Sequence, residues 1–263
     1  MSRFIINGPK TLKGEFYING SKNAATPILT ATLLIHEQCI LDNVPHVSDV
    51  QKMLELMRSL GAEAQWTEPN QITINTSKAN TTHLNEQLIK SMRSSILLIG
   101  PMLSRFNSIT IPEPGGCFLG NRPLDTHISV LEQFGAEVKR EKNEQGKEQY
   151  SISIKKMHGA DITLSEFSVT ATENAIMLAA LGSGRTIIRL AAQEPHIQNL
   201  ISFLDAAGAD IHEKPGNKII INGVKKLHGV AHRIIPDMIE TGTLAIAGAL
   251  VGRGIVLHNI EPN

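Results

Sequence analysis

One segment of the chain combines a thiol, a cation and unusually flexible backbone. Between positions 112 and 125, three prolines and three glycines surround Cys117 and Arg122. Helix interiors and central strands tolerate this composition poorly, whereas a mobile loop brings backbone and a thiol close to a ligand. The Arg122 guanidinium suits phosphate or carboxylate, and a nearby cation acidifies a thiol. The segment therefore predicts anion binding with proton transfer by Cys117, although a glycine-rich turn with a half-buried cysteine fits it equally well.

Composition sets limits on the class of protein. The 263 residues suffice for one large or two ordinary domains, and 25 Lys and Arg balance 25 Asp and Glu, so no overall charge favours nucleic acid or an anionic membrane. Only two cysteines occur, Cys39 and Cys117, which favours a reducing compartment without disulfides. No apolar run reaches membrane-spanning length and no signal segment is recognisable, so a cytoplasmic location is expected. The ten histidines show no metal-ligand spacing.

A repeated unit organises the chain. A helical pattern that ends in Gly-Ala-acid and leads into a strand recurs with its glycine at Gly61, Gly135 and Gly208, which are 74 and 73 residues apart. Each glycine lies where a helix end needs a left-handed residue. A strand and a proline turn precede each copy, and each turn opens an amphipathic helix. The turns are Val44-Pro45, Glu113-Pro114 and Glu194-Pro195.

A second helix, rich in small and apolar residues, precedes each of these segments. Its copies are expected to begin near Lys22, Met92 and Thr172, and closing strands follow, as at 71–74 and 218–221. The order helix, strand, helix, strand, strand favours parallel crossovers. Because each unit is too small to bury its own faces, three units are predicted to pack into an inside-out α/β domain, with helices inward and sheets outward.

A fourth copy of the unit starts at Glu240 and reaches its proline turn at 261–262, where the sequence stops. The pattern predicts one complete three-unit domain over residues 20–232. Residues 1–19 and 233–263 are interpreted as fragments of an incomplete second domain, whose C-terminal segment lacks its packing partners. An alternative is that this tail docks on the first domain.

Four segments together resemble the UDP-N-acetylglucosamine 1-carboxyvinyltransferases, the enolpyruvyl transferases of peptidoglycan synthesis. They are residues 20–25, 114–127, 168–174 and 233–243. The resemblance implies two inside-out α/β domains of three repeats each, with the N-terminal strand belonging to the second. It implies transfer of enolpyruvyl from phosphoenolpyruvate to the sugar 3-hydroxyl, with release of phosphate and without a metal or organic cofactor. The expected partners are these two small-molecule substrates.

The same resemblance assigns roles to individual residues. Cys117 is expected to be the proton donor to the methylene carbon of phosphoenolpyruvate, and hence the target of alkylating epoxides such as fosfomycin. Lys22, Arg93 and Arg122 are expected to gather around the substrate anions. The residues expected to hold the sugar nucleotide are Asn23, Pro123, Leu124, Asp125 and Thr126 for the sugar and uridine, and Ser168 and Val169 near the diphosphate.

The chain also departs from the family pattern. Thr170 stands where glycine is usual, and Glu166 falls where some members carry a lysine against phosphate. A hydroxyl can still donate to phosphate, but a carboxylate repels it, so weak diphosphate binding is expected. His127 is expected to orient its loop, Asp237 and Glu240 to be structural at the hinge between domains, and Cys39 to be a small buried hydrophobic residue.

Three functional readings compete. The family's second domain supplies an aspartate base and further arginines, which would lie beyond residue 263, so this polypeptide is expected to be inactive or very weak unless another chain completes the site. The alternative is a non-catalytic UDP-N-acetylglucosamine-binding paralogue or a gene fragment. The shikimate-pathway transferase of the same fold is a third reading, and the Gly-Gly-Cys loop argues against it because that enzyme's site has no thiol acid.

Overall fold

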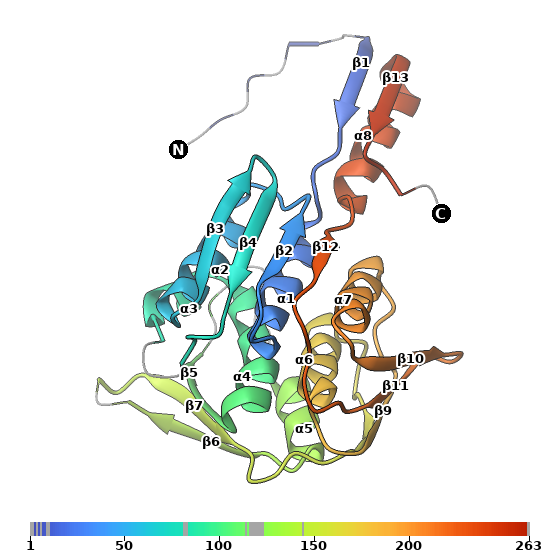
Figure 1. Cartoon of the computed structure of the whole chain (residues 1–263). Helices are drawn as coiled ribbons and strands as arrows, with labels where there is room; N and C mark the ends of the chain where they lie inside the picture. The colour runs from blue at the N-terminus through green and yellow to red at the C-terminus, as the bar shows by residue number, and fades with distance from the viewer. Residues whose placement is uncertain are drawn as a thin grey trace.

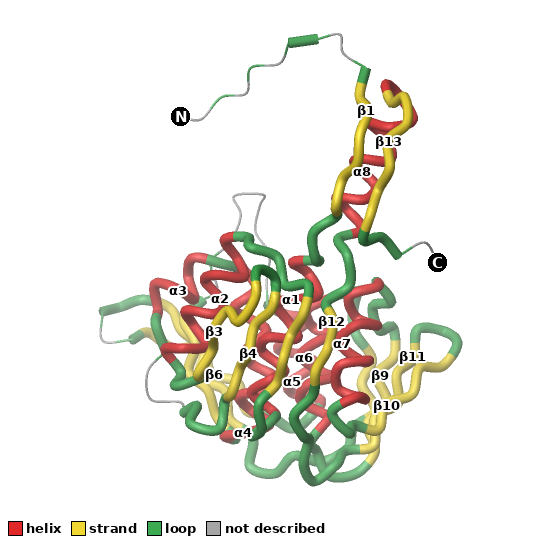
Figure 2. The backbone as a smooth tube through the Cα atoms, turned by 45° about the horizontal axis from the view of Figure 1, so that its top comes forward, coloured by secondary structure: helices red, strands yellow, loops and turns green. Residues whose placement is uncertain are grey.

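The structure is a computed structural model that describes residues 3, 5, 7, 8, 11–80, 84–113, 115, 124–143 and 145–261. Within them, three sheets surround a group of helices, and a two-stranded ladder projects from this body (Figures 1 and 2). In spatial order, the first sheet contains β12 (Ala231–Arg233), β2 (Cys39–Asp42), β4 (Gln71–Asn75) and β3 (Glu63–Glu68). The second contains β5 (Ser108–Pro112), β7 (Glu148–Ser153) and β6 (Glu137–Lys142). The third contains β10 (Asp210–Lys214), β11 (Lys218–Asn222), β9 (Arg185–Arg189) and β8 (Asp161–Thr163).

The helices fall into an inner and an outer set. The inner set is α1 (Lys22–Ala31) with η1 (Thr32–Leu34), η2 (Arg93–Leu98) with α4 (Ile99–Phe106), and α6 (Val169–Ala180). The amphipathic outer set is α2 (Ser48–Ser59), α5 (Asp125–Gln133) and α7 (Pro195–Ala206), with the short α3 (Glu86–Ser91) beside α2. Figure 1 shows the inner helices enclosed by the sheets.

Burial explains why the inner helices lie inside. Every residue from 24 to 31 in α1 and from 171 to 180 in α6 is buried. Helices that are largely apolar on all sides are stable only when surrounded by protein. Strand β4, in contrast, alternates buried Ile72 and Ile74 with half-buried residues, as expected of a sheet with one face on the core. The predicted inside-out α/β fold is confirmed.

The repeat also predicts local backbone geometry correctly. Gly61, Gly135 and Gly208 have φ values of 96°, 86° and 99°, in the left-handed region that ends helices. Strand β8 pairs in parallel with β9 across the intervening helix α6. Strand β12 at the end of the third unit pairs in parallel with β2 of the first, so the three units close into a ring.

Two inner helices begin differently from the prediction. The helix expected from Met92 starts as the 3₁₀ helix η2, after Met92 itself takes an extended conformation with φ −150°. Pro101 in α4 has no N–H to bond the fourth residue before it, which explains why regular α-helix starts only around Ile99. Helix α6 starts at Val169, earlier than expected, because the Ser168 side chain accepts a hydrogen bond from the backbone N–H of Ala171.

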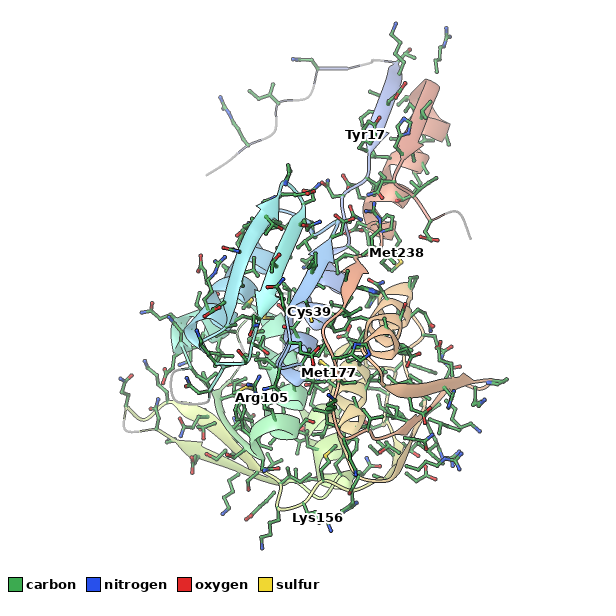
Figure 3. All side chains as sticks on the ribbon, viewed as in Figure 1. Tyr17, Cys39, Arg105, Lys156, Met177 and Met238 are labelled. Carbon is green, nitrogen blue, oxygen red and sulfur yellow. The ribbon has the colours of Figure 1, made fainter. Side chains whose placement is uncertain are left out.

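The projecting part consists of β1 (Leu12–Tyr17), α8 (Met238–Val251) and β13 (Gly252–His258). Strand β1 pairs in parallel with β13, and α8 packs on that ladder without burying any of its own described residues. Figure 3 shows Tyr17 and Met238 in this part and Cys39 within the body. No described helix is long and apolar enough to cross a membrane.

Two chain segments join the projecting part to the body. The N–H of Ser21 donates to the carbonyl oxygen of Ile235 at 2.8 Å, and that of Asp237 donates to Asn19 at 2.8 Å. The side chain of Asn259 donates to the carbonyl oxygen of Ile18 at 2.6 Å. The division into residues 20–232 and two flanking fragments stays a prediction. The bond from Ser21 to Ile235 would cross that boundary, whereas the other two join the flanking fragments to each other.

A glycine substitution tests the close approach that ends α6. A Cβ atom on Gly223 would lie 1.7 Å from the carbonyl oxygen of Gly182, so Gly223→Ala must push α6 and β11 apart. We expect a loss of at least about 2 kcal/mol in the free energy of unfolding. Gly242→Ala is the control, because its Cβ meets nothing within 4 Å and alanine favours the helix. Urea unfolding, monitored by the fluorescence of the single tryptophan, Trp66, measures the stability of both variants. Equal unfolding midpoints for Gly223→Ala and Gly242→Ala would contradict the expectation.

Candidate functional site

Those residues predicted to bind substrates that the structure describes lie at the starts of helices. Lys22 and Asn23 open α1, and Arg93 opens η2. Leu124 and Asp125 begin α5, and Ser168 and Val169 begin α6. Helix starts carry unpaired backbone N–H groups and the positive end of the helix dipole, so they suit anionic ligands.

Side-chain hydrogen bonds join the start of α5 to the start of α6. The Thr126 hydroxyl donates to Glu166 Oε1 at 2.9 Å and lies 3.2 Å from the Ser165 hydroxyl. His127 Nε2 lies 2.8 Å from the Thr170 hydroxyl. The two segments predicted to hold the nucleotide, one around Thr126 and one around Ser168, are therefore brought together.

His127 is a neutral imidazole beside a cation. It is 7% exposed, and burial together with the charge of Arg93 lowers its pKa to about 4. Its Nδ1 atom is buried and has no hydrogen-bond partner among the described residues. The electrostatic effect of Arg93 on His127 means that the start of η2 lies near the start of α5, so a third predicted binding residue belongs to this group.

Lys22 faces a different element. Its Nζ atom lies 3.0 Å from Asp49 Oδ2 in the first turn of α2, and the two side chains are 45% and 31% exposed. Such exposed ion pairs contribute about 0–1 kcal/mol, so a dianionic ligand can displace Asp49. Asn23 is exposed beside it. The sequence did not predict Asp49 as the partner of Lys22, because two residues 27 positions apart form no recognisable local motif.

The centre of the cysteine loop lies outside the described residues. This holds for Cys117, Arg122 and Pro123, whose predicted roles stay predictions. The loop begins in close contact with α3, since a Cβ atom on Gly115 would lie 1.5 Å from the carbonyl oxygen of Lys90.

The structure also contains a pair of carboxyl groups that the sequence did not indicate, one buried (Glu173) and one half-buried (Glu194). Glu173 in α6 is 1% exposed, and burial followed by the charge of Glu194 raises its pKa well above the usual value. One oxygen of each carboxyl group is buried without a hydrogen-bond partner in the described part of the chain. Burial therefore favours the neutral acid form of Glu173 over its carboxylate.

Three further expectations are confirmed. Cys39 is fully buried, and burial raises the pKa of its thiol. Asp237 caps α8 by accepting from the N–H groups of Ile239 at 2.8 Å and Glu240 at 3.2 Å. Glu240 accepts from the backbone N–H of Asn19 at 2.9 Å, so both acidic residues are structural at the junction.

Comparison with known proteins decides the family. The pattern described as EPSP synthase (3-phosphoshikimate 1-carboxyvinyltransferase) matches residues 6–263. The chain belongs to the EPSP synthase family. Among solved structures, the enolpyruvyl transferase NikO from Streptomyces tendae has a TM-score of 0.80 at 22% identity, over 94% of this chain and 57% of NikO. EPSP synthase from Acinetobacter baumannii has a TM-score of 0.77 at 22% identity, over 98% of this chain and 58% of the other. These likenesses establish the shared fold.

Curated relatives within the family carry the name predicted from the motifs. The chain is 40% identical over 263 residues to the UDP-N-acetylglucosamine 1-carboxyvinyltransferase of Hydrogenovibrio crunogenus, covering all of this chain and 62% of the relative. It is 41% identical to UDP-N-acetylglucosamine 1-carboxyvinyltransferase 1 from Carboxydothermus hydrogenoformans, covering 100% of this chain and 61% of that relative. The relative from Prochlorococcus marinus MED4 is 42% identical over 98% of this chain and 56% of its own length. The chain thus spans about three-fifths of the length of these relatives, and the predicted resemblance is confirmed.

Acid should weaken the folded state through His127. The pKa of His127 is about 4 in the folded state and about 6.5 in the unfolded state. Its contribution to the free energy of unfolding is therefore complete above pH 6.5 and is lost as the pH falls towards 4. Between pH 7.5 and pH 5 this amounts to about 2 kcal/mol of unfolding free energy. His127→Gln should lose less stability over this range, whereas exposed His36→Gln should behave as wild type. Urea unfolding at the two pH values measures this, and parallel losses in wild type and His127→Gln would contradict it.

Glu173 should act in the opposite direction. The pKa of Glu173 is raised on folding. Its contribution to the free energy of unfolding is therefore complete below its unfolded pKa and is lost as the pH rises through the pKa of the folded state. Relative to Glu173→Gln, the wild type should lose up to about 1.4 kcal/mol per pH unit within that window. Exposed Glu55→Gln serves as the control. Unfolding free energies from pH 5 to 8 test this, and a constant difference between wild type and Glu173→Gln would refute it.

Proposed function

We propose that this chain takes part in the transfer of enolpyruvyl from phosphoenolpyruvate to the 3-hydroxyl of UDP-N-acetylglucosamine. The observation that carries the proposal is the 40% identity over all 263 residues to a protein of that name. The helix-start residues support it, because phosphoenolpyruvate carries both a carboxylate and a phosphate and needs converging cations. We place the reaction in the cytoplasm, in accord with a sequence that contains only two cysteines.

In this proposal each residue has a defined task. Lys22 leaves Asp49 and binds the anionic groups of phosphoenolpyruvate together with Arg93 and Arg122. Cys117 donates a proton to the methylene carbon, so that the neighbouring carbon becomes electrophilic towards the sugar hydroxyl. Asn23 holds the sugar nucleotide. The uridine lies along residues 123–126, and the diphosphate lies near Ser168 and Val169.

The electrostatics around His127 are compatible with this chemistry. Because burial and Arg93 keep its pKa at about 4, the imidazole is neutral near pH 7. The positive charge beside the predicted substrates then comes from Arg93, which cannot lose its proton in a protein. Near pH 7, His127 therefore adds no positive charge to the anion site.

A second candidate function is binding of UDP-N-acetylglucosamine without turnover. Glu166 departs from the family pattern in the segment proposed to hold the nucleotide, where its carboxylate accepts from Thr126. Such a departure favours a degenerate paralogue, in which the negative charge weakens the binding of the diphosphate without abolishing it. Catalysis also needs a base for the acceptor hydroxyl, and no residue of this chain is assigned that role.

Phosphate release distinguishes the two functions. Under the transferase function, the full chain given phosphoenolpyruvate and UDP-N-acetylglucosamine should release phosphate, although slowly because no base is assigned, and shikimate 3-phosphate should not replace the acceptor. Cys117→Ala should abolish the release, whereas Cys39→Ala should retain it, since Cys39 is buried away from solvent. Calorimetric binding of UDP-N-acetylglucosamine without phosphate release would favour the second function. Absence of both binding and release would refute both.

Epoxide labelling tests the thiol separately from turnover. Fosfomycin should add to Cys117, and the adduct should appear by mass spectrometry of the digested protein. Cys39 is the internal control, since it is 0% exposed and its thiol pKa is raised, so it should stay unmodified. An unmodified Cys117, or equal labelling of both cysteines, would count against the proposed proton donor.

A further inference from the structure

Two adjacent residues of α5 reach across to the segment that leads into α6. Thr126 donates to Glu166 Oε1 at 2.9 Å, and His127 Nε2 pairs with the Thr170 hydroxyl at 2.8 Å. Thr126 and His127 are 8% and 7% exposed. Both hydrogen bonds therefore connect the first turn of α5 to residues around the start of α6.

Within the described residues, the start of α5 has no side-chain cap. Its N-cap residue is Leu124, whose side chain cannot accept a hydrogen bond. The start of α6, in contrast, is capped by Ser168. A helix end without a cap frays readily, which means that bonds from α6 take over the task of holding the turn.

We propose that Glu166 and Thr170 are positioning residues that hold the first turn of α5 against the start of α6. The proposal concerns these two side chains, which have no assigned role in the reaction. As far as substrate is concerned, it rests on the proposed function, in which residues 124–126 and 168–169 hold the nucleotide. Joined in this way, the two segments form one surface that is ordered before the nucleotide binds, so binding costs less conformational entropy.

The Glu166 carboxylate can affect nucleotide binding in two opposite ways. Through its charge alone, Glu166 opposes the diphosphate, and any neutral substitute should improve binding. As a hydrogen-bond acceptor for Thr126, it orders the surface, and only a substitute that keeps the acceptor oxygen should preserve binding. The two effects predict opposite results for Glu166→Ala, which makes the proposal testable.

Paired variants of the full chain separate these effects. Glu166→Gln keeps an acceptor oxygen without the charge, and Glu166→Ala removes both. Thr170→Ser keeps the hydroxyl, and Thr170→Val removes it at nearly constant shape. Thr110→Val is the matched control, since Thr110 pairs with the Ser151 hydroxyl at 3.4 Å on the exposed face of the second sheet.

Hydrogen–deuterium exchange of the ligand-free variants tests the positioning itself. In Glu166→Ala and Thr170→Val, amides 128–131, the first whose N–H groups donate within α5, should exchange about fivefold faster, as expected for the loss of one hydrogen bond. The amides of β11 give the reference for global unfolding and should keep their rates. Glu166→Gln, Thr170→Ser and Thr110→Val should match wild type. Unchanged exchange at 128–131 in both disruptive variants would overturn the proposal.

Calorimetry with UDP-N-acetylglucosamine tests the consequence for binding. The Kd should rise about fivefold in Glu166→Ala and Thr170→Val, and should stay near the wild-type value in the conservative variants. Tighter binding by Glu166→Ala would show that charge dominates, and would overturn the proposal. If wild type itself does not bind while exchange changes as expected, the positioning stands and the proposed function fails.

Discussion

The position of the candidate site depends on a single buried side chain, Asn174 of α6. Its Oδ1 accepts from the N–H of Gly100 at 2.7 Å, and its Nδ2 donates to the carbonyl oxygens of Ile96 and Thr170 at 3.2 and 3.0 Å. A Cβ atom on Gly100 would lie 2.6 Å from the Asn174 carbonyl oxygen, so α4 and α6 are as close as two backbones can pack. This contact fixes the start of η2, with Arg93, relative to the start of α6.

The site follows from that arrangement. Buried inner helices leave their starts as the places where polar groups reach solvent, and the outer helix α5 is tied to them through Thr126 and His127. Burial that stabilises the ring of three units also sets the charge of the site, because it keeps His127 neutral beside Arg93. Both positions at which the chain departs from the family pattern, Glu166 and Thr170, are partners in these hydrogen bonds.

The sequence predicted what depends on local or periodic chemistry. Gly135 was placed at a helix end because a left-handed backbone needs glycine, and Cys39 in the core because it lies in an apolar strand. The 3₁₀ start of η2 was missed, although Pro101 carried the information, because the apolar periodicity of the segment suggested one regular helix. The Lys22–Asp49 and Glu173–Glu194 pairs could not be predicted, since they depend on packing between residues distant in sequence.

In the proposed reaction, the cations at the helix starts and in the cysteine loop surround one anionic substrate. A crystal structure of the full chain with phosphoenolpyruvate and UDP-N-acetylglucosamine would test this arrangement. In such a structure Lys22 Nζ should have left Asp49, and the side chains of Lys22, Arg93 and Arg122 should all contact the same phosphoenolpyruvate. A ligand bound elsewhere, or these three side chains on separate faces of the protein, would contradict it.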